Sequence, residues 1–195
     1  MSESITRVRI PVERLGVLIG AEGNAKKIIE KKYSVDIEVD SKTGDIQVFS
    51  KSKTLNPAII FRVKDIILAI GRGFSPEKAF RLFNEDVNFG IIDLRDIFGR
   101  SLSDIQRIKG RIIGKNGKTR IIIEELTGAS ISVYGHTISI IGELSQFDIA
   151  REAIKMFIEG RMHKNVYGFL HRKRADFKKE KLELWKTPIP EQAKK

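Results

Sequence analysis

A short segment with two glycines has the residue types and spacing best suited to chemistry in this chain. Gly114 and Gly117 enclose Lys115 and Asn116, and residues 118–127 follow without glycine or proline and with the apolar spacing of a helix. A helix N-terminus presents unpaired N–H groups and a partial positive charge, so it attracts anions. Glycines ahead of it let an anion approach the backbone without meeting a Cβ. The segment is therefore typical of a phosphate-binding loop.

The same frame occurs earlier in the chain. A shift of 94 positions places Gly20 on Gly114 and Gly23 on Gly117. The agreement continues through the following helix and strand, with the pairs Ile28 and Ile122, Ile29 and Ile123, Glu30 and Glu124, Ile37 and Ile131, and Val39 and Val133. Such ordered agreement indicates one supersecondary unit that is used twice.

The pattern around each loop predicts the elements that position it. Periodicity and turn residues predict, in order, a strand (5–10 and 89–94), a short helix (12–19 and 103–113), the loop, a helix (24–32 and 118–127), two strands (36–40 and 45–48, 130–133 and 137–140) and a closing helix (59–70 and 150–158). A further helix is predicted over 75–83. Because the connection from it to Val87 is short, we expect two modules packed as one unit.

This order resembles a type I KH domain, and the loop is similar to the KH signature. The match is close in the second copy, where residues 112–118 lead to Ile122 and then to Thr127, Gly128 and Ala129. The resemblance covers residues 4–160, and the tandem copies with a basic tail resemble an archaeal member of the ribosome-assembly family related to eukaryotic partner-of-Nob and Krr-type proteins. It implies an α+β fold with two KH modules, each a three-stranded antiparallel sheet with helices on one face. The implied division is a first KH domain with a helical extension (1–85), a second KH domain (86–160) and a basic C-terminal helix and tail (161–195).

The resemblance also implies a function. KH domains clamp about four single-stranded nucleotides, with the backbone against the glycine loop. The implied RNA is small-subunit rRNA near its 3′ end during ribosome maturation, and the implied partners are the rRNA 3′-end endonuclease and the alpha subunit of translation initiation factor two. The residues expected to bind RNA are Arg111, Ile112, Ile113, Gly114, Lys115, Asn116, Gly117, Lys118, Arg120, Ile131 and Val133. Their isoleucines and valine, with Ile121 or Ile122, would line the groove or form the core beneath it. The alternative is a KH-fold adaptor for proteins that binds RNA weakly or not at all.

Charge distinguishes the two copies. Residues 105–123 contain no carboxylate and six cations, namely Arg107, Lys109, Arg111, Lys115, Lys118 and Arg120. The first loop instead contains Glu22, whose carboxylate would repel a phosphate by on the order of 1 kcal/mol or more. We therefore expect RNA binding mainly from the second copy. The first copy would bind weakly through Gly20, Ala21, Gly23, Asn24, Lys26 and Lys27, bind a partner protein, or hold the second copy in place.

The tail after residue 160 permits two interpretations. It is basic, with Arg172, Lys173 and Arg174 in a row, and it has interspersed aromatic residues. It would form a helix that lies along RNA. Alternatively, the helix docks Leu182 and Trp185 on the second module, with a frayed end after Pro188.

Composition limits the remaining classes. The 195 residues include 36 Lys and Arg against 25 Asp and Glu, so the net charge is +11, which favours a polyanionic partner. There is no cysteine and only three histidines, so we expect neither metal nor cofactor. The loop ends like a nucleotide-binding P-loop, but the required first glycine is Ile112. We expect a cytoplasmic protein that is not an enzyme and does not bind membranes.

Overall fold

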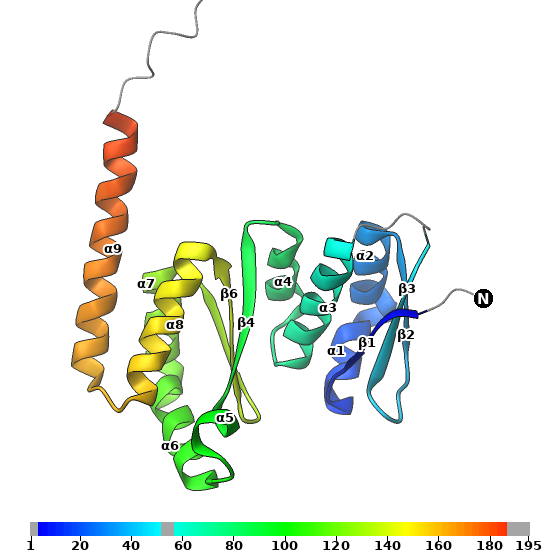
Figure 1. Cartoon of the computed structure of the whole chain (residues 1–195), viewed down its shortest axis with the longest axis horizontal. Coiled ribbons are helices and arrows are strands. Elements are labelled where there is room, and N and C mark those ends of the chain that lie inside the picture. The colour runs from blue at the N-terminus through cyan, green and yellow to red at the C-terminus, as the bar shows by residue number, and fades with distance from the viewer. Residues whose placement is uncertain (1–3, 52–56, 187–195) are drawn as a thin grey trace, which may run out of the picture.

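Two copies of one α+β unit lie next to each other in the computed structural model, followed by a long helix (Figure 1). The structure describes the backbone of residues 4–51 and 57–186 and the side chains of residues 6–51 and 57–179. The first copy comprises β1 (Ser4–Arg9), α1 (Leu15–Ile19), α2 (Asn24–Tyr33), β2 (Val35–Val39), β3 (Asp45–Ser50) and α3 (Pro57–Gly71), and α4 (Pro76–Ala79) follows it. The second copy comprises β4 (Val87–Asp93), α5 (Leu94–Phe98), α6 (Leu102–Ile113), α7 (Lys118–Thr127), β5 (Ser130–Tyr134), β6 (Thr137–Glu143) and α8 (Leu144–Ile158), and α9 (His163–Lys186) ends the described chain.

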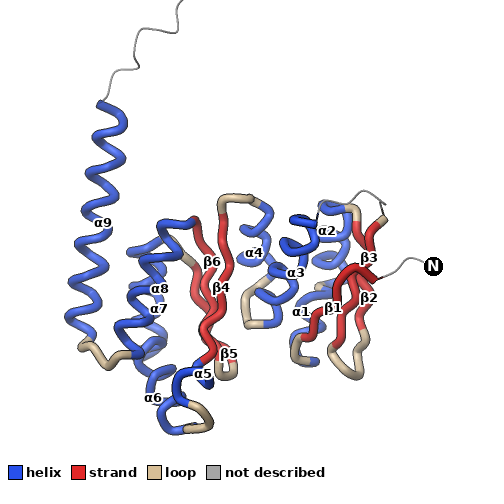
Figure 2. The backbone as a smooth tube through the Cα atoms, viewed as in Figure 1, coloured by secondary structure: helices blue, strands red, loops and turns tan. Residues whose placement is uncertain are grey.

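Each copy contains a three-stranded antiparallel sheet with its third strand in the centre (Figure 2). The strand order is β1-β3-β2 in the first copy and β4-β6-β5 in the second. Equivalent residues pair in equivalent registers, since Ile37 lies opposite Val48 and Ile131 lies opposite Ile140. The duplicated α+β unit expected from the sequence is confirmed.

The two sheets differ in how they are covered. In β3 buried residues alternate with partly exposed ones, as in a sheet with one solvated face, whereas Thr137 to Gly142 of β6 are all buried. Ile140 packs in the core of its own module, and the next residue, Ile141, packs in the core of the first module together with Ile66 and Ile70 of α3. The second sheet therefore lies between two layers of helices (Figure 1).

Polar contacts close the border between the modules. The Arg81 guanidinium, which follows α4, donates to the Ser130 hydroxyl at 2.9 Å and to the Gly128 carbonyl at 3.3 Å. The Ser132 hydroxyl donates to the Arg72 carbonyl at 2.8 Å. Further contacts join Tyr134 to the Glu13 carboxylate and place the Arg14 guanidinium over the Tyr134 ring. The modules pack as one unit, as the short connection predicts.

The start of the second module differs from the sequence prediction. The expected strand over 89–94 is β4, which begins at Val87 and ends at Asp93. The Asp93 carboxylate accepts a hydrogen bond from the Arg95 N–H at 2.8 Å, so it caps a short helix, α5, that the sequence pattern did not predict. The single helix expected over 103–113 is α6, and a turn separates it from α5.

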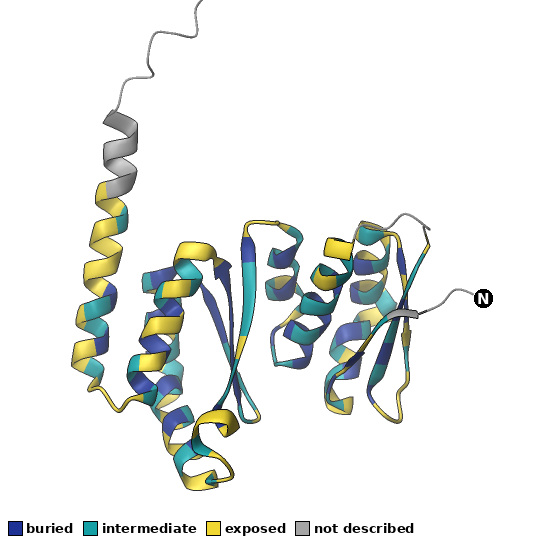
Figure 3. Ribbon diagram, in the orientation of Figure 1, coloured by how far each residue is buried: buried dark blue, intermediate teal, exposed yellow. Residues whose placement is uncertain are grey.

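The beginning of α9 packs against the second module. Val166 and Leu170 are buried, and the Tyr167 hydroxyl lies 3.0 Å from the Thr119 hydroxyl of α7. From His171 onward the described side chains are exposed, apart from the half-buried Phe177 (Figure 3). The predicted docking of Leu182 and Trp185 and the frayed end after Pro188 lie outside the described side chains. Within residues 4–51 and 57–186, no helix combines the length and the apolar character needed to cross a bilayer.

Candidate nucleic-acid interface

The backbone of the second glycine loop explains its residue types. Gly114 has φ 71° and ψ 177°, and a Cβ at this position would lie 2.2 Å from the Thr119 hydroxyl oxygen. Both the backbone angle and the close approach therefore require glycine. Asn116 and Gly117 follow in the left-handed region, with φ 54° and 77°. Asparagine is one of the few residues that adopt this conformation readily.

The loop leaves the start of α7 uncapped. Helices α4, α5 and α6 begin after Ser75, Asp93 and Ser101, whose side chains accept hydrogen bonds from the first turn. Gly117 precedes α7 and provides no such acceptor. The first-turn N–H groups of α7 therefore lack a side-chain partner, beside the exposed Lys115, Asn116 and Lys118. This arrangement can bind a phosphate group.

Apolar residues extend from the loop between α7 and β5. Ile113 and Val133 are half-buried, and Ile121 is 43% exposed. Ile113, Ile121 and Val133 lie 94 residues after Ile19, Lys27 and Val39, which line one hollow in the first module. We call the equivalent surface at Ile113, Ile121 and Val133 the second groove. Ile112 and Ile131 are buried in the core beneath it. The isoleucines were expected either to line the groove or to form the core under it, and these two form the core.

The six cations of this region do not form one free basic face. The Arg111 guanidinium donates to the backbone carbonyls of Phe157 and Arg161 and lies over the Phe157 ring. These contacts link α6 to the end of α8. They also restrain the Arg111 side chain, and its contact with RNA stays a prediction. Arg107 and Arg120 are engaged as well, with Asp104 and Glu124 respectively.

The first loop has nearly the same geometry as the second. Gly20 has φ 74° and ψ 177°, Glu22 has φ 54°, and Gly23 has φ 74°. Ala21, Glu22 and Asn24 are exposed, and the Lys27 ammonium donates to the Glu22 carbonyl at 3.0 Å. A hollow of about 340 Å³, which we call the first groove, is lined by Ile19, Gly23, Lys26, Lys27, Glu30, Val39 and Ser41. The loop backbone of the first copy is therefore suited to binding a phosphate group, whereas the negative charge of Glu22 is not.

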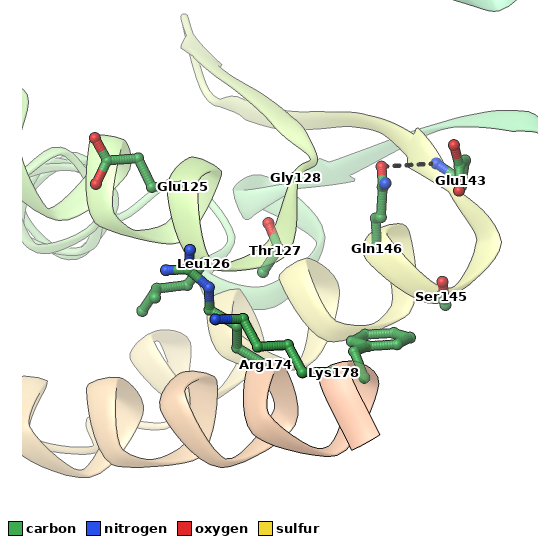
Figure 4. A pocket seen from close by; sticks show the side chains of 10 residues that line it. Glu125, Leu126, Thr127, Gly128, Glu143, Ser145, Gln146, Arg174 and Lys178 are labelled. Atoms are coloured by element: carbon green, nitrogen blue, oxygen red, sulfur yellow. Dashed lines mark hydrogen bonds between the residues drawn. The ribbon is translucent and has the colours of Figure 1, made fainter. Parts of the chain in front are cut away.

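The tail cations lie on the exposed part of α9. Arg172, Lys173 and Arg174 are all exposed. Arg174 and Lys178 also line a pocket of about 470 Å³ between α9 and the ends of α7 and β6 (Figure 4). Glu125 and Glu143 line the same pocket. The sequence did not predict this pocket, because it depends on the direction in which α9 leaves the second module. Within the described residues, no three His, Asp or Glu side chains gather as a metal site would require.

The fold and the loops define a class of protein. Two units with the type I KH order, each with an uncapped helix after a two-glycine loop, make this a tandem KH protein. Family models agree, since one for the Krr1 KH1 domain matches residues 14–85 and one for the eukaryotic type KH-domain (KH-domain type I) matches residues 88–175.

Relatives match nearly the whole chain. A KH domain-containing protein of Methanocaldococcus jannaschii is 44% identical over 94% of this chain and 80% of its own length. An Aeropyrum pernix protein of known crystal structure has 38% sequence identity to this chain. The two structures match with a TM-score of 0.85 over 95% of this chain and 98% of the other. Dim2p of Pyrococcus horikoshii OT3, in the crystal structure of its complex with a/eIF2alpha and rRNA, is 47% identical, with a TM-score of 0.80 over 88% of this chain and 94% of the other. The chain belongs to the tandem KH-domain family of the PNO1 and Krr1 type, a non-catalytic family.

Proposed function

We propose that this protein binds single-stranded RNA, with the phosphate backbone at the second loop and the bases over the second groove. The observation that carries the proposal is the uncapped start of α7, which follows Gly117 and lies beside the exposed Lys115 and Lys118. Anions bind at helix N-termini of this kind. The apolar surface from Ile113 to Val133 provides the stacking surface that unpaired bases need.

The proposed RNA is small-subunit rRNA near its 3′ end during ribosome maturation. Support comes from the Pyrococcus horikoshii Dim2p, which is 47% identical and was crystallised with rRNA and a/eIF2alpha. By the same similarity we propose the alpha subunit of translation initiation factor two as a protein partner. The first loop and the tail residues Arg172, Lys173 and Arg174 are proposed secondary contacts.

The test replaces the two exposed inner residues of the second loop. In the double variant Lys115→Asp with Asn116→Asp, two carboxylates lie where we place a phosphate. We expect affinity for a 3′-end rRNA oligonucleotide to fall at least about 100-fold at low salt, because charge is reversed at a phosphate contact. Fluorescence anisotropy measures this affinity.

The matched control makes the same charge change elsewhere. Lys155→Asp with Asn84→Asp alters exposed positions on α8 and ahead of β4, neither of them in the loop or on α9. We expect a much smaller loss from this control. Equal losses in the two variants would show that only net charge matters, and unchanged binding in the loop variant would remove the assignment.

Salt dependence separates RNA binding from the adaptor alternative. The logarithm of RNA affinity should fall with the logarithm of salt concentration by about 0.7 per phosphate neutralised. Wild-type protein that shows no RNA binding at low salt, but binds the initiation-factor subunit equally well at high salt, would favour the adaptor.

A further inference from the structure

The edge of β5 facing the second groove is held by one carboxylate. Glu124 of α7 accepts a hydrogen bond from the Ile131 N–H at 2.7 Å. Arg120, one turn earlier, approaches the Glu124 carboxylate at 3.6 Å and donates to the Ile131 carbonyl at 3.4 Å. Glu124 and Arg120 thus engage both backbone polar groups of Ile131. We call these contacts the Ile131 clip.

The carboxylate contact is repeated in the first module. Glu30 accepts a hydrogen bond from the Ile37 N–H at 2.8 Å and is paired with Lys26 at 3.5 Å. Glu30 and Ile37 lie 94 residues before Glu124 and Ile131, and Glu30 also lines the first groove. The two modules therefore share this side-chain contact at equivalent positions.

The second module adds a contact from outside itself. The Lys78 ammonium of α4, which follows the first module, lies 3.3 Å from the Glu124 carboxylate. Its side chain is 43% exposed, and that of Glu124 is 19% exposed. The Glu124 carboxylate thus has three partners: it accepts hydrogen bonds from the Ile131 N–H of β5 and from Lys78 across the border between the modules, and it forms an ion pair with Arg120 of its own helix.

The clip determines which backbone groups remain available on β5. Residues of an antiparallel edge strand alternate between those bonded to the neighbouring strand and those whose N–H and C=O point outward. The Ile131 N–H points outward to Glu124, so Val133, two residues on, also points its backbone groups outward. The Val133 side chain is half-buried, at the groove. With Ile131 engaged, Val133 is the residue of β5 that offers a donor and an acceptor beside the groove.

We propose that Glu124 is a positioning residue for base selection in the second groove. By engaging Ile131 it fixes the edge of β5 against α7, and it leaves the Val133 backbone to meet the edge of a base. This inference rests on the proposed RNA binding and concerns which bases are preferred, not whether phosphates bind. Glu30 has the corresponding position in the first groove.

The test compares Glu124→Ala and Glu124→Gln in the full chain. The alanine variant removes the acceptor for the Ile131 N–H, whereas glutamine keeps a carbonyl oxygen there and loses the charge. Binding is measured for a preferred rRNA oligonucleotide and for a panel with single-base replacements. We expect the alanine variant to bind the preferred sequence about tenfold more weakly and the replaced sequences only about twofold more weakly. The glutamine variant should retain most of the preference.

Two further measurements keep the test decisive. Amide hydrogen exchange should show faster exchange of the Ile131 N–H in a Glu124→Ala protein that remains folded. Glu125→Ala, at the exposed neighbouring position of α7, should leave preference and Ile131 exchange unchanged. Equal weakening for every sequence, or an unchanged preference, would overturn the role of Glu124. Wild-type protein that binds no RNA would instead overturn the proposed function.

Discussion

Glu22 and Asn116 occupy the same position in their loops and the same left-handed backbone conformation, with φ 54° in both. Asparagine tolerates this conformation well, whereas a glutamate side chain has no local hydrogen bond that compensates for it. The second loop is thus favourable in backbone and in charge. The first loop has the same backbone conformation, but Glu22 is less suited to that conformation than Asn116 is.

Replacing Glu22 with Asn should therefore stabilise the protein. We expect the free energy of unfolding to rise by about 0.5–1 kcal/mol, because left-handed backbone is less costly for Asn than for Glu. Urea denaturation monitored by circular dichroism measures the change. The reciprocal Asn116→Glu should destabilise by a similar amount, and two changes of the same sign would contradict this explanation.

The residue scale also shows what the sequence could and could not reveal. The loop at Gly114, Asn116 and Gly117 was predictable because its backbone conformation depends on the types of these local residues. The engagement of Arg111 was not, because its acceptors, Phe157 and Arg161, lie 46 and 50 residues further along the chain. Burial of Ile112 and exposure of Ile121 depend in the same way on how α6 and α7 pack.

At the scale of elements, the glycine inside α6 and the glycine that follows its last residue have opposite requirements. Gly110 lies inside the helix with open space where a Cβ would be, whereas Gly114 ends the helix with positive φ against Thr119. Gly110→Ala should raise the free energy of unfolding by about 0.5–1 kcal/mol, through helix propensity. Gly114→Ala should lower it by about 2 kcal/mol or more, through strain and overlap.

Chemical denaturation of both alanine variants measures these changes. The pair tests the loop geometry with one type of substitution. A Gly114→Ala protein as stable as wild type would show that the backbone at this position differs from the structure.

Helix α3 contains a carboxyl group whose charge is unfavourable. Partial burial of Asp65 raises the pKa of its carboxyl group, and the nearby Arg62 and Lys64 oppose this only in part. A carboxyl whose pKa is higher in the folded state contributes most to stability when protonated, and the contribution is lost as pH rises through the raised pKa.

Asp65→Asn should therefore be more stable than wild type at neutral pH. The difference should shrink as pH falls toward about 4, the ordinary range of an aspartate. Denaturant unfolding at several pH values measures it, with the exposed Asp148→Asn as control. A difference that does not vary with pH would contradict the role of burial.

The fold of the whole molecule shows which parts of a tandem structure a sequence predicts. The element order was predictable because the duplicated pattern gives each strand and helix twice. The arrangement of the two modules was not predictable. In β6, Ile140 packs in the core of the second module and Ile141 in the core of the first. Two consecutive isoleucines in a strand indicate burial of both faces, but they do not show which element covers each face. The projection of α9 and the pocket beside it depend on packing of the same kind.

The border between the modules should contribute to cooperative unfolding. Arg81→Ala removes hydrogen bonds to Ser130, Gly128 and Gln146, and we expect it to lower the free energy of unfolding by about 1–3 kcal/mol. Differential scanning calorimetry measures this loss and the width of the transition. The exposed Arg151→Ala should have little effect, and equal effects of both variants would show that the border contributes nothing specific.

The most direct test of RNA binding at the second loop uses the wild-type protein. Amide chemical shifts of ¹⁵N-labelled protein are recorded while an rRNA 3′-end oligonucleotide is added. We predict the largest changes at the amides of Asn116, Gly117, Lys118 and Thr119, and smaller ones at Glu22, Gly23, Asn24 and Ala25. Changes confined to α9, or larger at the first loop than at the second, would contradict the account.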